Sequence, residues 1–79
     1  MSNMDKLKAE FDKAIANDPA VWDTPISPDP GAPLRKDAIN AMFSGEDSQM
    51  VEFIIDQRVA SGEKVEDIAQ EMMTEILAI

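Results

Sequence analysis

The side chains of this chain that could do chemistry are almost all carboxylates. The 79 residues include 16 Asp and Glu and 7 Lys and Arg, but neither histidine nor cysteine. Without histidine and cysteine there is no thiolate nucleophile, no imidazole base, no Ser-His-Asp triad and no zinc site of the usual nitrogen and sulfur kind. What remains is acid–base chemistry by paired carboxylates, or cation binding by oxygen ligands.

Neither of these remaining chemistries has a supporting pattern. Carboxylates one helical turn apart, such as Glu52 and Asp56, are ordinary on an acidic helix. An EF-hand loop needs oxygen ligands at alternating positions, a central glycine and a closing glutamate, and neither 23–34 nor 44–55 supplies them. We therefore expect no enzyme activity, no catalytic residue, no metal site and no cofactor.

The most distinctive pattern is a series of acids near the C-terminal end. Four of them are spaced by four residues and a fifth flanks them: Glu63, Asp67, Glu71 and Glu75, with Glu66. The spacing predicts a row of carboxylates along one side of a helix, roughly 6 Å apart. A solvated face is the simplest interpretation, although like charges at this spacing destabilise an isolated helix by roughly 0.2–0.5 kcal/mol per pair. The alternative is a surface that docks on a basic partner protein.

The distribution of charge favours a basic partner. The net charge is −9, and residues 44–79 hold nine acids and only two bases, Arg58 and Lys64. Such a surface repels phosphate backbones and attracts basic proteins, so we expect no direct nucleic-acid binding. Since a row of carboxylates resembles a phosphate array, one form of this function is an inhibitor that mimics nucleic acid and masks a nucleic-acid-binding site.

The elements that would position these acids are predicted to be helices. Apolar residues recur every three or four positions in 3–17 and again from 64 to the end. Five prolines within 18–33 predict a linker without regular helix. The rest, 34–79, reads as a compact helical unit with stops at Ser44-Gly45 and at Ser61-Gly62. We predict one all-α domain over 1–79, a small bundle of three to four helices with a proline-rich linker after the first helix.

The apolar faces of the predicted helices are broad, which indicates that part of this surface contacts a second copy or a partner. The predicted helix that starts near Asp47 or Ser48 has so wide an apolar arc that we expect it to be central in the fold. One core in a chain this short, without disulfides, supplies little stability. Association with a second copy would add to it, and we therefore expect a homodimer. The candidate apolar interface residues are Trp22, Met72, Met73 and Ile76. Trp22 is either a plug in the core or part of an interface.

The segment Gly45-Glu46-Asp47-Ser48 resembles the start of the attachment helix in acyl and peptidyl carrier proteins. The resemblance implies that Ser48 carries a phosphopantetheine arm at a helix N-terminus. It covers four residues, and Gln49 stands where the family has leucine. Ordinary helix capping by Asp47 and Ser48 is the alternative interpretation. A carrier function and a structural or assembly adaptor are therefore the alternatives to docking on a basic partner.

The start of the chain and its short apolar runs predict the compartment. Residues 1–6 do not form a charged segment followed by an apolar one, as in a secretory signal. The longest apolar runs are far below the roughly 18 residues of a membrane helix. We expect a cytoplasmic protein with no membrane contact.

Overall fold

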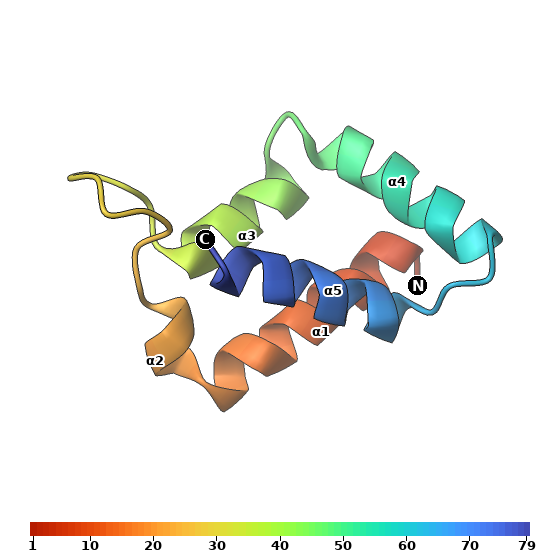
Figure 1. The fold of residues 1–79 in the computed structure, drawn as a ribbon. Coiled ribbons are helices and arrows are strands. Elements are labelled where there is room, and N and C mark those ends of the chain that lie inside the picture. Colours follow the sequence, from red (N-terminus) through yellow and green to blue (C-terminus); the bar gives the residue numbers. More distant parts are fainter.

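The computed structural model describes residues 1–79 as a bundle of five helices around one core (Figure 1). The helices are α1 (Asn3–Asn17), α2 (Pro19–Trp22), α3 (Arg35–Ser44), α4 (Ser48–Ala60) and α5 (Val65–Leu77). The core contains ten buried residues, all of them apolar. The all-α prediction is confirmed, with one short helix, α2, beyond the expected number.

The first helix begins at a capping box. The Ser2 hydroxyl accepts a hydrogen bond from the Asp5 N–H at 3.1 Å, and the Asp5 carboxylate accepts one from the Ser2 N–H at 3.3 Å. The buried side of α1 carries Met4, Leu7 and Phe11. Because α1 packs against α3, α4 and α5, the N-terminal helix is part of the bundle and not a separate arm.

The proline-rich segment contains a helix that the proline spacing did not predict. Pro19 is the first residue of α2, where its missing N–H leaves no hydrogen bond unmade and its fixed φ suits a helix. α2 ends at Trp22, which is only 3% exposed and lies in the core. The prediction of a linker without regular helix is therefore wrong for Pro19–Trp22.

After α2 the chain forms a loop that projects from the body of the bundle at the left of Figure 1. The loop closes at an isolated antiparallel bridge between Pro25 and Leu34. Two hydrogen bonds hold this closure, from the Arg35 N–H to the Thr24 carbonyl and from the Ile26 N–H to the Pro33 carbonyl, each 2.9 Å long. The proline segment is thus tied to the start of α3.

Two glycines mark helix ends where the sequence predicted them. Gly45 follows α3, and a Cβ at this position would lie 2.6 Å from the Ala41 carbonyl oxygen. Gly62 follows α4 and has a φ of +101°, in the left-handed region that glycine adopts readily. These positions set the turns that precede α4 and α5.

The expectation that α4 is central is wrong. Ile55 is the one buried residue of α4, and Val51 and Val59 are half-buried against the core. Met50 and Phe53 are each 64% exposed and Ile54 is 47% exposed, and the helix lies at an edge of the bundle (Figure 1). The core occupies one side of α4, so the remaining part of its wide apolar arc faces solvent.

No helix of the bundle combines the length and the apolar character that crossing a membrane requires.

Candidate functional site

The acids of the predicted row lie on and just before the exposed side of α5. Asp67, Glu71 and Glu75 are exposed residues of the helix, at intervals of roughly 6 Å along its axis. Glu63 lies outside α5, because Lys64 is the N-cap residue and Val65 is the first helical one. Glu66 is exposed, but it is rotated by roughly 100° from Asp67 around the helix axis. The helical row therefore has three members.

Arg58 of α4 neutralises part of this row. Its Nε and Nη2 donate to the two carboxylate oxygens of Glu63 at 2.9 and 2.7 Å, and Nη2 also donates to Glu71 at 2.5 Å. The hydrogen bonds that Arg58 donates to Glu63 and Glu71 raise the pKa of Arg58, and the hydrogen bond that Glu63 accepts lowers the pKa of Glu63. Asp67 and Glu75 have no such cation partner. The spacing of the acids did not predict this division, since Arg58 belongs to another helix.

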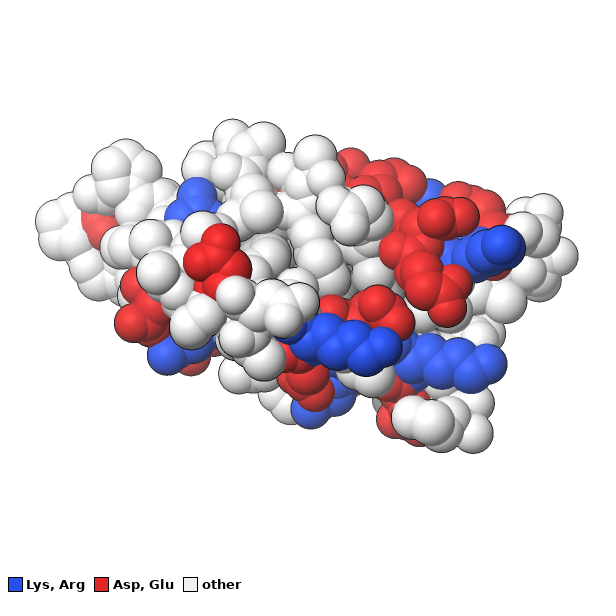
Figure 2. Space-filling view, turned by 90° about the horizontal axis from the view of Figure 1, so that it is seen from below, with Lys and Arg blue, Asp and Glu red and all other residues white.

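Three of the remaining basic side chains form ion pairs within the chain. Lys8 pairs with Asp12, Lys13 with Glu10, and Lys36 with Asp23. The hydrogen bond and the charge of Asp23 raise the pKa of Lys36. On the face shown in Figure 2, acidic side chains lie in several separate groups, the largest of them toward one end, and basic side chains lie among and beside them. The charged surface is therefore mixed and does not form one continuous acidic array.

Two of the four candidate apolar interface residues lie in the core, and the other two pack against it. Trp22 and Met73 are buried, and Met72 and Ile76 are half-buried and packed against the core. The apolar stripe of α5 is used in contacts with α1, so it is not a free surface. A role of these four residues in an interface with another chain therefore stays a prediction.

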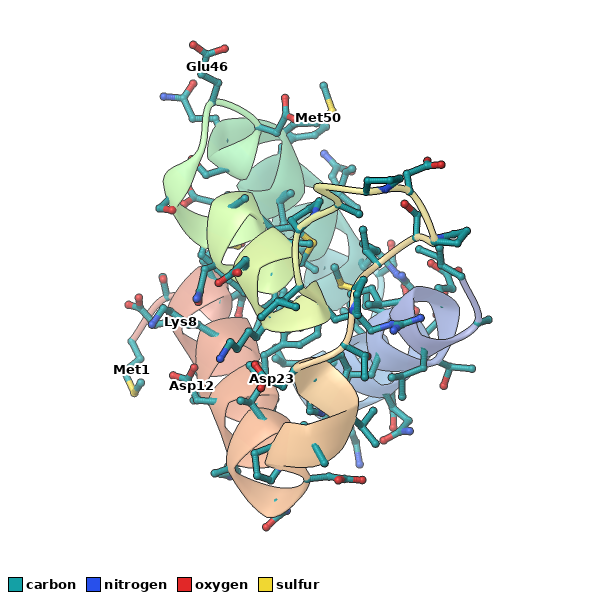
Figure 3. The ribbon with its side chains drawn as sticks, turned by 90° about the vertical axis from the view of Figure 1, so that its left-hand side faces the viewer. Met1, Lys8, Asp12, Asp23, Glu46 and Met50 are labelled. Atoms are coloured by element: carbon teal, nitrogen blue, oxygen red, sulfur yellow. The ribbon has the colours of Figure 1, made fainter.

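The exposed apolar surface lies instead on α4, at Met50, Phe53 and Ile54. In Figure 3, Met50 points away from the body of the molecule, near the turn that carries Glu46. The sequence signal for this surface was present in the wide apolar arc. The arc predicted a central helix instead of an exposed surface, because periodicity does not show how many sides of a helix are covered.

Ser48, the residue that the carrier-protein resemblance singles out, is the first residue of α4 and is half-buried. It lines an open groove between α1, α3 and α4, together with polar side chains that include Asp5, Lys8 and Glu52. The preceding N-cap residue, Asp47, makes no side-chain capping hydrogen bond. Asp47 thus occupies the predicted N-cap position, but without the hydrogen bond by which a cap side chain stabilises a helix.

Comparisons with protein-family models, with curated proteins and with solved structures each found no match to this chain. The carrier-protein resemblance therefore rests on Gly45-Glu46-Asp47-Ser48 alone and stays a prediction. The class that the structure defines is a small all-α bundle, and fold class by itself does not determine function. The functional argument depends on the surface.

The contact between Arg58 and Glu63 predicts a pH-dependent stability. Because Arg58 lowers the pKa of Glu63 below its ordinary 4.5 in the folded chain, the contact stabilises the fold above that pH. The stabilisation is lost as the pH falls through the lowered pKa. Glu63→Gln should therefore lower the urea midpoint near pH 7, and the difference from the wild type should shrink as the pH falls below 4.5 and through the lowered pKa.

Urea unfolding at several pH values checks this expectation. Asp29→Asn, in the projecting proline loop, is a control that removes one carboxylate outside the helices. We expect it to leave the midpoint nearly unchanged near pH 7. A difference between Glu63→Gln and wild type that grows on acidification would contradict the assignment.

Proposed function

We propose that this chain is a non-catalytic binding protein that docks the exposed acidic side of α5 on a basic partner protein. The observation that carries the proposal is the pairing pattern of the row. Asp67 and Glu75 are exposed and have no cation partner in the chain, whereas Glu71 shares the guanidinium of Arg58 with Glu63, which precedes the helix. A partner's lysines and arginines would supply the missing cations.

The range and strength of electrostatic attraction determine how much an acidic surface contributes to the rate and affinity of binding. Unpaired carboxylates attract a basic protein over roughly 8–10 Å at physiological salt, which speeds the encounter and orients it. An exposed ion pair adds only about 0–1 kcal/mol to affinity. Lasting binding therefore needs apolar contact in addition to the acidic row.

An inhibitor is one form of this function. If the basic surface of the partner binds nucleic acid, docking of α5 would mask it, because Asp67, Glu71 and Glu75 present a regular series of negative charges. The guanidinium of Arg58 reduces the charge of this series at Glu71. The mimicry is therefore partial, and competition with nucleic acid for the captured partner is its test.

Replacing Asp67→Asn together with Glu75→Gln is expected to weaken partner binding about tenfold at low salt. The physical reason is the loss of the two row carboxylates that are free to pair with the partner. Immobilised wild-type chain would capture the partner from source-cell lysate, with elution by a salt gradient and identification by mass spectrometry. The dissociation constant of the purified partner would then be compared between the variants.

A matched control removes two charges elsewhere. Asp29→Asn with Glu46→Gln changes the exposed proline loop and the α3–α4 turn. An equal loss of affinity in this control would show that net charge alone matters, and an unchanged affinity of the α5 variant would show that its acids are only solvated. Either result would contradict the proposed docking.

The adaptor and homodimer hypotheses make different predictions. An adaptor bound through apolar positions should resist high salt, and the glutamine and asparagine substitutions should matter little. A homodimer should be visible by sedimentation equilibrium without any partner. Both stay predictions, and the exposed apolar residues of α4 are the surface on which they would depend.

A further inference from the structure

We propose that the outer face of α4 is the apolar part of the docking surface, and that it takes a basic amphipathic helix of the partner. The inference rests on the proposed function and names the occupant. Met50, Phe53 and Ile54 stand at positions i, i+3 and i+4, so their exposed side chains are neighbours on one helix face. They form the largest run of exposed apolar side chains on any helix of the bundle.

This outer face contains no charged residue. With a rotation of 100° per residue, Met50, Phe53, Ile54, Gln57 and Ala60 fall within an arc of roughly 120°, and all five are exposed. The chain as a whole has a net charge of −9. An exposed apolar face with polar surroundings is typical of a protein-binding surface.

Carboxylates surround the uncharged face. The Asp56 side chain accepts a hydrogen bond from Asn3 of α1 at 3.0 Å, and Glu52 lines the groove beside α1, so both lie along one edge. Further acids lie at the α3–α4 turn and beyond the other edge: Glu46, Asp47, Glu63 and Glu71. The one basic residue of α4, Arg58, is already bound to Glu63 and Glu71. The complement of this surface is an apolar stripe flanked by lysine or arginine.

A second copy of the chain fits this surface poorly. Two-fold antiparallel pairing of α4 brings the same edge of each helix together, so Glu52 and Asp56 would face their own duplicates. Parallel pairing would bring that edge to Arg58, whose guanidinium is occupied. Three side chains supply far less than the roughly 800 Å² per partner of a standard interface, so either occupant needs further contacts. A basic helix adds ion pairs to the same apolar contact, which a second copy cannot do.

Three synthetic peptides of equal length test the occupant. The first places leucine and lysine at amphipathic helical spacing, the second replaces lysine by glutamate, and the third scrambles the leucine–lysine sequence. The wild-type chain should bind the first peptide at least about tenfold more tightly than either other peptide. Fluorescence anisotropy of labelled peptide gives the dissociation constants.

Phe53→Ser with Ile54→Ser should weaken binding of the leucine–lysine peptide at least about tenfold, because both changes remove exposed apolar contact area. The matched control is Leu77→Ser with Ile79→Ser, which changes two exposed apolar residues at and just after the end of α5 and should alter binding less than about twofold. Circular dichroism establishes that both variants keep their helices.

Each other outcome has a distinct meaning. Loss of binding in the Asp67→Asn, Glu75→Gln variant but not in the α4 variant overturns this inference and leaves the proposed docking of α5 standing. The reverse pattern supports α4 and overturns α5. Equal binding of the lysine and glutamate peptides, or no binding, overturns the basic occupant. A dimer in sedimentation equilibrium that Phe53→Ser abolishes overturns it in favour of a second copy.

Discussion

Phe11→Ala is expected to leave a large fraction of the chain unfolded at 25 °C. Phe11 is fully buried on α1, and its ring meets that of Phe43 edge to face, with 5.9 Å between centroids and an interplanar angle of 66°. Removing such a ring from a core lowers the free energy of unfolding by about 3–5 kcal/mol. A single core in a chain of this size seldom supplies more than about 3–5 kcal/mol in total. The loss therefore matches the whole expected stability.

The same substitution on α4 is a direct control. Phe53 is mostly exposed, so Phe53→Ala should change the free energy of unfolding by no more than about 0.5 kcal/mol. Urea unfolding followed by circular dichroism and by the fluorescence of the buried Trp22 measures both variants. Equal destabilisation by the two substitutions would contradict the division between the core and the outer face of α4.

Arg35→Met is expected to lower the free energy of unfolding by about 2 kcal/mol. The Arg35 guanidinium joins two distant segments. Nη1 donates to the Thr24 hydroxyl at 2.6 Å and to the Pro25 carbonyl at 2.9 Å, in the proline segment. Nε donates to the Ile76 carbonyl at 3.2 Å and Nη2 to the Ile79 main-chain oxygen at 2.8 Å. These last two bonds satisfy oxygens at the end of α5. A positive charge there also interacts favourably with the negative end of the helix dipole.

Arg35→Lys separates the charge from the hydrogen bonds. Lysine keeps the positive charge but lacks the planar fork that reaches both segments at once, so we expect it to recover less than half of the lost stability. Urea midpoints give the stability, and the Trp22 emission maximum reports whether the proline segment has loosened. Full recovery in the lysine variant would show that the charge alone acts at the end of α5.

The bounds of a helix were predicted closely where they depend on residues near one another in the sequence. The predicted range 3–17 is that of α1, and the final apolar stripe becomes α5, because helical spacing and helix-stop residues act within a few positions. The proline spacing did not predict the helix at Pro19–Trp22, because proline breaks a helix interior but is tolerated at the first helical position. The sequence thus predicts elements well where the signal lies inside the element.

The candidate site depends on contacts between elements, and those were harder to predict. The four-residue spacing correctly put Asp67, Glu71 and Glu75 along α5. It could not show that Glu63 lies before the helix, or that Arg58 of α4 binds Glu63 and Glu71. An apolar pattern identifies a face to be covered but not what covers it. Met72 and Met73 proved to pack within the chain, and Phe53 did not.

The most direct test of the docking surface is an NMR titration of isotope-labelled chain with the leucine–lysine peptide. The proposal predicts that the largest chemical-shift changes fall on the outer face of α4, at Met50, Phe53 and Ile54. Smaller changes are expected at the flanking Glu52 and Asp56 and at the acids of α5. Changes confined to the proline segment, or spread evenly over the acidic residues, would contradict it.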